Sequence, residues 1–394
     1  MNPVVVIPSY WADDGADAAG PARYDHATPL DAEKPELDAC LASLASVPDM
    51  CRVAVLAVCP LAVTAQVRSR IEKIAAGHPS LDVVVVTNAE AARVMGRIEE
   101  IAPDVSGETV SLRGYGAIRN MGLAVAAILG HDVVVFLDDD EVVLDGRFLE
   151  QALHGLAHQT RQGLPILAKS GYFYDRGGSP YARKEKVRWC DRWWTKRQEF
   201  NEWMRRALST TRISRSNYAC GGLMALHARA YTRVAFDPYI TRGEDMDYLF
   251  NLRMQGLDMW FDNAWAVRHL PPRRESSAPR FMQDVYRWYY EQAKIADSNG
   301  RQDTHQVTAS SLMPYPGKWL SPELESRVAR TSLARAVATP EHAAYFRIWR
   351  RGRDEARAYA RENAGSYLRF QNFWATIMNG LWRDADLARM LLGE

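Results

Sequence analysis

Four consecutive acidic residues, Asp138-Asp-Asp-Glu141, follow an apolar and mostly β-branched run from Val133 to Leu137. Such a run indicates a fully buried strand, and open α/β sheets bind ligands at the carboxyl ends of their strands. Adjacent carboxylates repel one another unless they have a partner, commonly a hard divalent cation bound together with a substrate phosphate. By themselves the four acids indicate either such a metal site or an acidic turn in water.

Side chains alternate along a strand, and this alternation divides the four acids into two pairs. Asp138 and Asp140 point to one side, and Asp139 and Glu141 point to the other. One pair can therefore face a metal ion and a nucleotide, and we expect it to be Asp138 and Asp140. Asp139 and Glu141 are expected to be structural.

Further segments contain side chains that suit the same chemistry. A glycine-rich stretch leads into a helix with Arg119 in its first turns, which is a ready anion site. The Gly221-Gly222 pair lets a ligand approach the backbone closely, and Glu244-Asp245 begin a helix that ends near Gly256. Each has an ordinary alternative: a plain helix start, a tight turn, and acids favoured by the helix dipole. His269, which follows a strand, is by itself more typical of a structural histidine.

Alternating strands and helices must position these residues. The predicted strands span residues 3–9, 52–59, 81–87, 133–137, 166–174 and 259–267, and predicted helices span 36–45, 63–76 and 148–160, with another after Gly116. This order predicts βαβ units and an α/β domain with a mainly parallel sheet. From Ala278 onward the pattern is helical. Ser321-Pro322 and Thr339-Pro340 predict the starts of two helices, and a last helix is expected over about 366–383.

Length and composition indicate a soluble enzyme with two subdomains. The chain has 394 residues, 47% of them hydrophobic and 25% charged, with a net charge of +1, which gives no sign of bulk nucleic-acid binding. Five cysteines without C-x-x-C spacing favour a reduced setting without a cysteine-based zinc site. No apolar run is long enough to span a bilayer, and no signal-type segment is present. We therefore expect a cytoplasmic protein without a transmembrane segment.

Residues 176–217 mix many lysines and arginines with tyrosine, tryptophan and phenylalanine. Such a segment is suited to an acceptor-binding insertion that prefers an acidic or phosphorylated partner. The alternative, which is slightly favoured, is an amphipathic helix with its tryptophans in the core and its basic face in water.

In order and spacing, these segments resemble the GT-A nucleotide-sugar glycosyltransferases, most closely glycosyltransferase family 2. The resemblance covers about residues 3–272. The matching elements are Val4–Ser9, Gly116–Ala124, the D-x-D element Phe136–Glu141, Cys220–Leu223, Gly243–Asp247, Gly256 and His269. The D-x-D element alone is a weak signal, but the ordered series is specific. The resemblance implies a GT-A catalytic domain over 1–272, with 176–217 as an insertion, and a helical C-terminal region over 273–394.

The resemblance also implies roles for individual residues. Asp138 resembles the acid that contacts the nucleotide ribose or the metal, Asp140 the main metal ligand, and His269 a further contribution to a Mn²⁺ or Mg²⁺ site shared with the donor diphosphate. Asp245, with Glu244 beside it, stands where inverting members place the general base. The expected donor-binding set is Pro8, Ser9, Tyr10, Asn88, Arg119, Asp138, Asp139, Gly221 and Gly222.

Two positions depart from the family pattern. Val58-Cys-Pro60 stands where an acidic turn usually follows the second strand, which leaves the nucleobase contact without a match. Thr87, Asn88 and Asp13 are the candidate substitutes for that contact. Asn251 stands where an arginine is common, and Arg253 lies two places later.

The implied activity is metal-dependent transfer of a sugar from a UDP- or GDP-sugar to an acceptor hydroxyl, with inversion and with Asp245 as base. The acceptor is expected to be acidic or phosphorylated, and a homo-oligomer is compatible with the sequence. The main alternative is a retaining GT-A enzyme similar to mannosylglycerate synthase, with a small acidic acceptor. A sugar-phosphate nucleotidyltransferase ranks lower because the loop after Ser9 is acidic. A silent binding protein ranks lower because the acids and His269 are retained.

Overall fold

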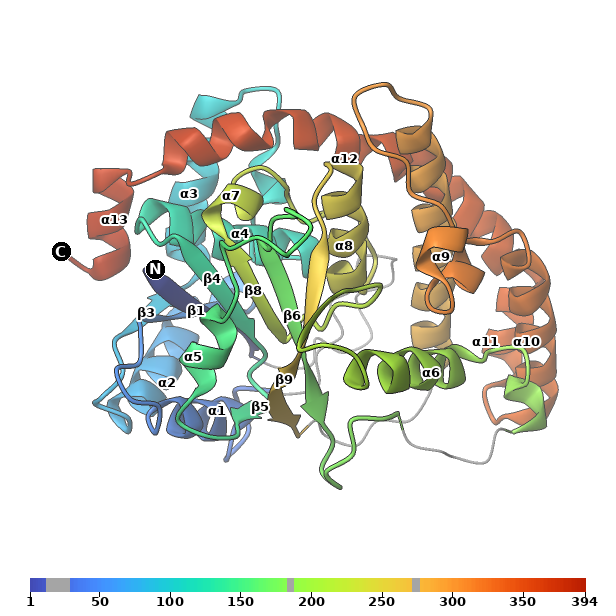
Figure 1. Ribbon diagram of the computed structural model, residues 1–394, viewed down its shortest axis with the longest axis horizontal. Coiled ribbons are helices and arrows are strands. Elements are labelled where there is room, and N and C mark those ends of the chain that lie inside the picture. The colour runs from blue at the N-terminus through green and yellow to red at the C-terminus, as the bar shows by residue number, and fades with distance from the viewer. Residues whose placement is uncertain (12–28, 183–187, 271–276) are drawn as a thin grey trace.

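The computed structural model describes residues 1–11, 29–182, 188–270 and 277–394. Within these residues one sheet runs through the molecule in the order β3-β2-β1-β4-β8-β6-β9-β5, and β7 pairs with β9 (Figure 1). The strands are β1 Pro3–Tyr10, β2 Val53–Val58, β3 Val83–Val86, β4 Val133–Leu137, β5 Glu141–Val143, β6 Ala168–Tyr174, β7 Ile213–Arg215, β8 Leu223–His227 and β9 Met259–His269. The predicted α/β class is confirmed.

The first four strands form a parallel unit covered by helices on both faces. Their valines are buried on both sides, as a parallel sheet requires. Val4 and Val6 of β1 belong to the core under helices α3 and α4, whereas Val5 and Ile7 pack with α1, α2 and α5. These helices are α1 Glu36–Leu44, α2 Thr64–Ala76, α3 Asn88–Ile101, α4 Tyr115–Ile128 and α5 Phe148–Leu153.

The second half of the sheet contains both parallel and antiparallel strands. Their pairing brings together residues of the candidate site that are far apart in the sequence. β8 is antiparallel to β4 and to β6, while β6 and β9 are parallel. β5 pairs antiparallel with β9, so that Glu141 stands opposite His269. The antiparallel direction of these pairings was not predicted, because a short apolar run does not encode the direction of its neighbour.

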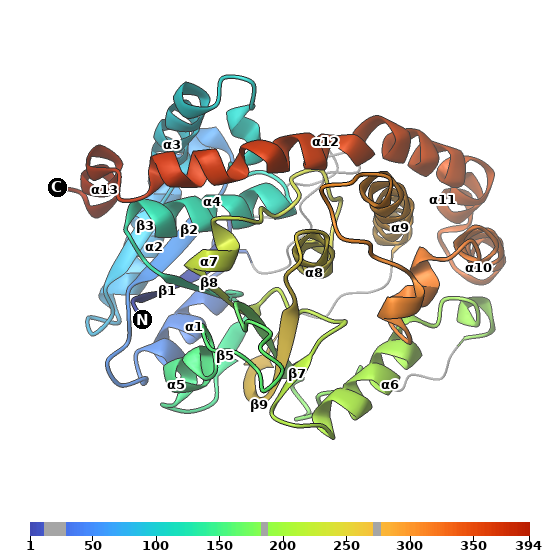
Figure 2. The same ribbon diagram turned by 45° about the horizontal axis from the view of Figure 1, so that its top comes forward.

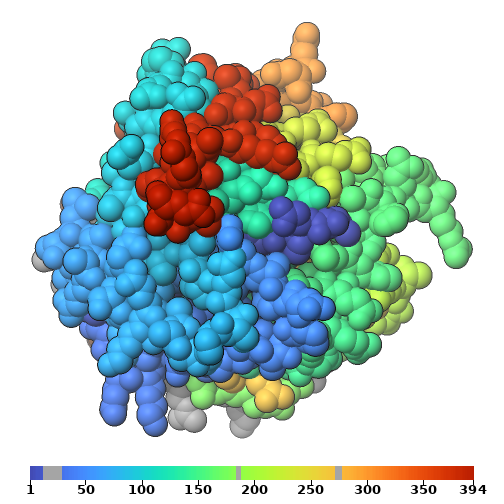
Figure 3. Space-filling model, turned by 90° about the vertical axis from the view of Figure 1, so that its left-hand side faces the viewer, coloured from blue at the N-terminus to red at the C-terminus, as the bar shows by residue number. Residues whose placement is uncertain are grey.

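Helices from the second half of the chain complete the fold. They are α6 Lys196–Leu208, α7 Ala228–Tyr231, α8 Glu244–Met254, α9 Ala278–Asn299, α10 Leu324–Ala338, α11 His342–Arg347, α12 Arg353–Leu381 and α13 Ala385–Leu392. α12 has 29 residues, about 44 Å at 1.5 Å per residue. It lies along α9 and reaches α4 and α3 (Figure 2). In Figure 3, the last helices lie over the N-terminal half of the chain.

Most predicted elements are confirmed within a few residues, but several boundaries are wrong. The helix from Phe148 ends at Leu153 instead of about residue 160, because Gly155 has a left-handed backbone. The helix from Asn88 was missed although Thr87 and Glu90 form a capping box, which is a readable start signal.

The expected caps in the C-terminal region are also wrong. α10 begins at Leu324, three residues after Ser321, and Thr339 ends α10 instead of starting the next helix. α12 begins 13 residues before the predicted start at residue 366. Its first half buries small residues, such as Ala356, Ala360 and Ala364, and these give a weak hydrophobic periodicity.

Part of the basic segment, residues 176–217, folds as an amphipathic helix, which was the slightly favoured of the two alternatives. α6 buries Trp203 and Met204 and exposes Arg205 and Arg206. Trp189, in contrast, is 57% exposed. The basic residues Arg183, Lys184 and Lys186 lie outside the described residues. Among the helices that the structure describes, none combines the length and apolarity needed to cross a bilayer.

Candidate active site

The chain turns sharply after β4, and the expected alternation of the four acids is therefore wrong. The backbone N–H of Glu141 donates to the carbonyl of Asp138 at 3.1 Å, closing a turn. Asp139 is buried and accepts a hydrogen bond from Ser9 Oγ at 2.7 Å. Glu141 begins β5, where its backbone stands opposite that of His269 in β9. Asp139 and Glu141 consequently lie in different surroundings and not on one side of a strand.

The carboxylate of Glu141 lies against Gly222. A Cβ atom at Gly222 would lie 2.5 Å from Glu141 Oε2, so only glycine leaves room for this carboxylate. Glu141 Oε2 and Asp140 Oδ1 are both buried and have no hydrogen-bond partner among the described residues. Asp140 Oδ2 lies 3.2 Å from His269 Nε2. Two buried carboxylate oxygens beside an imidazole thus have no protein hydrogen-bond partner in the described residues, which is unusual for buried polar atoms.

Arg119 connects the acidic turn to the start of α8. Its Nη2 lies 2.8 Å from Asp138 Oδ1, and its Nε lies 3.4 Å from Glu244 Oε1. The guanidinium is buried and also packs over the ring of Phe136. Arg119 was expected near the donor diphosphate. In this structure its visible role is to fix the positions of two carboxylates.

Gly221 lies where the acids of α8 approach Arg119. Its N–H donates to Asp245 Oδ2 at 3.2 Å, and Asp245 Oδ1 accepts from the N–H of Met246 at 2.7 Å. A Cβ atom at Gly221 would lie 3.2–3.4 Å from atoms of Asp245, Arg119 and Glu244. Asp245 remains partly exposed, whereas Glu244 is buried. Asp245 is therefore the carboxylate of this pair that a substrate can reach.

Burial shifts the pKa values of two acids in this region, Glu141 and Glu244, upward. Burial raises the pKa of Glu141 well above its usual range, and the charge of Asp138 adds to this effect. Burial also raises the pKa of Glu244, although Arg119 opposes the shift. For His269 burial acts to lower the pKa, but the hydrogen bond and charge of Asp140 prevail and raise it to about 9. Burial is thus the main cause of the two raised carboxyl pKa values, and neighbouring carboxylates add to it.

The residues expected on the nucleotide side lie at the carboxyl edge of the first strands. Pro8, Ser9 and Tyr10 form the buried end of β1. Asn88 Nδ2 donates to the carbonyl of Cys59 at 3.0 Å, which joins the start of α3 to the loop after β2. Thr87 was another candidate for the nucleobase contact, and its side chain caps the start of α3. Asp13 lies outside the described residues.

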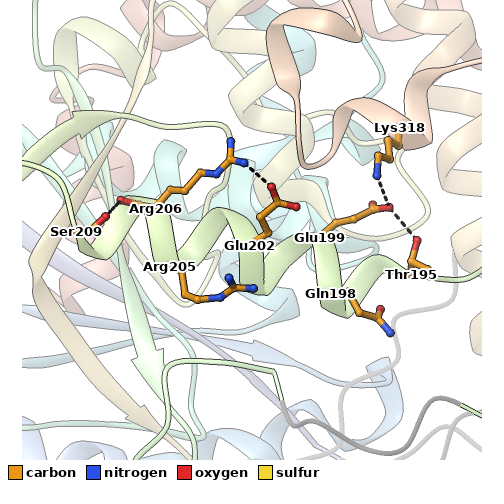
Figure 4. Close-up of a pocket in the computed structure, with 8 residues that line it drawn as sticks. All are labelled: Thr195, Gln198, Glu199, Glu202, Arg205, Arg206, Ser209 and Lys318. Carbon is orange, nitrogen blue, oxygen red and sulfur yellow. Dashed lines mark hydrogen bonds and ion pairs between the residues drawn. The ribbon is translucent and has the colours of Figure 1, made fainter.

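A separate hollow of about 700 Å³ lies over α6, outside the carboxylate region. Figure 4 shows its lining, which includes ion pairs of Arg206 with Glu202 and of Lys318 with Glu199. The two acids of its walls thus pair with two of the three basic residues, and Arg205 is the third. None of the sequence-predicted site residues lines it, and we assign it no role in the chemistry.

A GT-A glycosyltransferase is the class defined by this α/β sheet with acids at the end of β4 and at the start of α8. The model of the glycosyltransferase-like family 2 matches residues 52–291. Because the match covers more than half of the chain, the protein belongs to this family. The family, the GT-A fold and the enzyme class inferred from the sequence are thus confirmed. The comparison with curated proteins finds no match.

Among solved structures, a mannosyltransferase from Pyrobaculum calidifontis in complex with GDP-Man and Mn²⁺ is similar at 15% identity and a TM-score of 0.44, over 98% of this chain and 86% of that one. Glucosyl-3-phosphoglycerate synthase from Mycobacterium tuberculosis, in complex with Mn²⁺ and UDP-Glc, is similar at 16% identity and a TM-score of 0.33. That likeness covers 71% of this chain and 73% of the other. Both likenesses are distant.

Proposed function

We propose that the protein transfers a sugar from a nucleoside-diphosphate donor to an acceptor hydroxyl with the help of a divalent cation. The observation that supports this most is the pair of buried, unsatisfied oxygens, Asp140 Oδ1 and Glu141 Oε2, beside His269. Glu141 lies against Gly222, and the adjacent Gly221 lies against Asp245 and Glu244 at the start of α8. This arrangement suits a cation on one side and a base on the other.

The residues fit a cation that is shared with the substrate. Carboxylate oxygens and an imidazole nitrogen are ligands that Mn²⁺ accepts, and carboxylates suit Mg²⁺. In the described part of the chain, no three histidine, cysteine, aspartate or glutamate side chains converge into a complete metal site. A cation bound by one or two carboxylates plus donor phosphates needs no such cage. Asp140 and His269 would hold it, with the cation in place of the proton on His269, and Asp138 and Glu141 are adjacent.

When bound, the cation would stabilise the charge that develops on the leaving diphosphate. The protein's own contribution is to orient the groups around it. Arg119 fixes Asp138 and Glu244, and Ser9 fixes Asp139. Pro8, Tyr10 and Asn88 lie at the edge where the nucleoside is proposed to bind.

We assign the general base to Asp245. Glu244 is buried and engaged with Arg119, whereas Asp245 is partly exposed and is oriented by two backbone N–H groups. Asp245 would accept the proton of the acceptor hydroxyl as that hydroxyl attacks the anomeric carbon. Attack from the face opposite the leaving diphosphate inverts the anomeric configuration, which NMR of the product tests directly. Retention would exclude this role for Asp245.

Donor binding tests the proposal. We expect UDP- or GDP-sugars to bind the full chain in calorimetry with Mn²⁺, and to bind at least tenfold more weakly after chelation by EDTA. Asp140→Ala should weaken binding in Mn²⁺ to the level seen without it, because it removes a proposed ligand. Asp145→Ala is a matched control, since Asp145 is an exposed acid on the same stretch. Equal donor affinity with and without Mn²⁺ would contradict the metal assignment.

A further inference from the structure

Three basic side chains from different elements surround one carboxylate beside the start of α8. They are Lys196 of α6, Arg242 in the turn before α8, and Arg287 of α9. Asp284 of α9 lies 3.1 Å from Lys196 Nζ and 3.5 Å from Arg242 Nη1. The charge of Arg287 also acts on it. The group brings together parts of the chain nearly 90 residues apart.

This group has more positive than negative charge. Burial opposes ionisation of Asp284, but the three neighbouring cations prevail and depress its pKa, so that it is ionised. Glu291 is the next acid, 3.9 Å from Arg287 Nε, and burial raises its pKa well above the usual range. Even with Glu291 counted as an anion, the three cations outnumber the two acids that pair with them among the described residues.

Three further observations favour an anionic ligand for this group. Arg287 Nε is buried and has no hydrogen-bond partner among the described residues. The side chains of Lys196 and Arg242 are 25% and 19% exposed, so a ligand can reach them from outside. Burial, with the charges of Arg242 and Arg287, lowers the pKa of Lys196 to about 8 despite Asp284. An added anion would relieve this repulsion.

The group lies directly beside the proposed base. Arg287 Nη2 donates to the carbonyl of Gly243 at 3.1 Å, two residues before Asp245. Gly243 has a φ of 70°, and a Cβ atom there would lie 2.1 Å from Arg287 Nη1, so glycine allows this contact. Tyr315 is near both groups: burial raises the pKa of its hydroxyl, and the charges of Arg287 and Asp245 both act on it.

We propose that Lys196, Arg242 and Arg287 form an anion subsite for the acceptor. The acceptor then has a phosphate or carboxylate group, which this subsite binds while the acceptor hydroxyl faces Asp245. Guanidinium and ammonium groups bind such oxyanions through charge-assisted hydrogen bonds. The proposal rests on the proposed glycosyl transfer and adds the chemical class of the acceptor. It also gives α6 and α9, which are remote from the acidic turn in sequence, a direct part in substrate binding.

Calorimetry with three small probes tests the subsite. Glycerol 3-phosphate, glycerate and glycerol are titrated into the full chain saturated with Mn²⁺ and UDP or GDP, whichever binds. We expect one or both charged probes to bind and glycerol not to bind. The stronger of the two identifies the anion as phosphate or carboxylate. Lys196→Gln and Arg242→Gln should each weaken that binding at least tenfold. Arg205→Gln, an exposed arginine of the same helix, should not.

Three outcomes would overturn the subsite. Neither charged probe binds, or both variants bind the stronger charged probe as tightly as the native chain does, or glycerol binds the native chain as tightly as that probe. Displacement of the probe by the nucleoside diphosphate would show that the cations belong to the donor site, which also overturns it. Binding of the nucleoside diphosphate itself should be unchanged in Lys196→Gln and Arg242→Gln. If the native chain binds no nucleoside diphosphate in Mn²⁺, the proposed transfer fails. The probes are then titrated into the chain with Mn²⁺ alone, so that the subsite is tested separately.

Discussion

Arg119 pairs with two acids that are widely separated in the sequence, Asp138 and Glu244. This pairing shows which of the two carboxylates at the start of α8 is already engaged. Its guanidinium contacts Asp138 on one side and Glu244, 125 residues away, on the other. Glu244 is therefore already engaged, while Asp245 keeps an exposed face beside Gly221. A base must be reachable by the hydroxyl that it deprotonates. Geometry rather than residue type thus favours Asp245 for this role.

Asp245→Asn should reduce transfer by about 10²–10⁴-fold, the usual contribution of a general base. The amide keeps the size of the side chain but cannot accept the proton. Donor affinity in Mn²⁺ should be unchanged, because the donor is proposed to bind at the acidic turn. Initial rates of transfer and calorimetry measure the two effects. Asp104→Asn, at an exposed acid, serves as the control, and full turnover by Asp245→Asn would remove the base assignment.

α8 is fixed by a buried lysine of α9. Lys294 is fully buried, and its Nζ contacts Asp237 at 2.9 Å and also pairs with Asp247 of α8. It donates in addition to Asn251 Oδ1 at 3.0 Å. Asp237 lies in turn against Gly116, at the start of the helix that carries Arg119: a Cβ atom at Gly116 would lie 1.9 Å from the Asp237 carbonyl oxygen. One cation thereby sets the relative position of two helices that contribute to the site.

Lys294→Met should destabilise the fold by about 3–5 kcal/mol, because it leaves buried carboxylates without a cation. Denaturant unfolding measures this change. Adding Asp247→Asn should recover part of the loss, since the double variant buries one charge fewer. Lys73→Met makes the same substitution at an exposed site and should change stability by less than about 0.5 kcal/mol. A similarly small effect of Lys294→Met would show that the buried cluster contributes little.

The C-terminal region packs against the sugar-transfer domain along most of the molecule. α12 buries Tyr367, Trp374 and Leu381, and Trp374 Nε1 donates to the carbonyl of Tyr231 at 2.8 Å. Beyond α12, Arg97 of α3 pairs with Asp384 at 3.1 Å. We propose that residues 1–272 form the catalytic domain and 273–394 a helical region. The packing of α12 makes the stability of the first depend on the second.

Removal of residues 353–394 should therefore unfold the remaining chain. Losing one buried large side chain costs about 3–5 kcal/mol, and a whole fold is stable by about 5–15 kcal/mol. Circular dichroism and denaturant unfolding of the truncated chain measure the outcome. Removal of residues 385–394 alone, which contribute buried Leu387 and Leu391, should leave a cooperative transition. A cooperatively folded chain that ends at residue 352 would show that the N-terminal part is independent.

The sequence by itself determined the class of the protein and most of the elements that form the sheet. β-branched runs, glycines before helices and an ordered set of acids are local patterns. Such patterns can be recognised in the sequence without knowledge of the fold. They indicated Asp138, Asp140, Asp245 and His269 as candidates. The missed helix at Asn88 was also locally readable, from its capping box.

Only the tertiary structure decided how these residues meet. The turn after β4 separates Asp139 from Glu141, and the antiparallel pairing of β5 with β9 places Glu141 opposite His269. The cations beside α8 come from three elements, of which only α6 belongs to the segment whose basic composition was noticed. Strand direction and long-range packing depend on the whole core. A short stretch of sequence does not specify which distant side chains will pack against it.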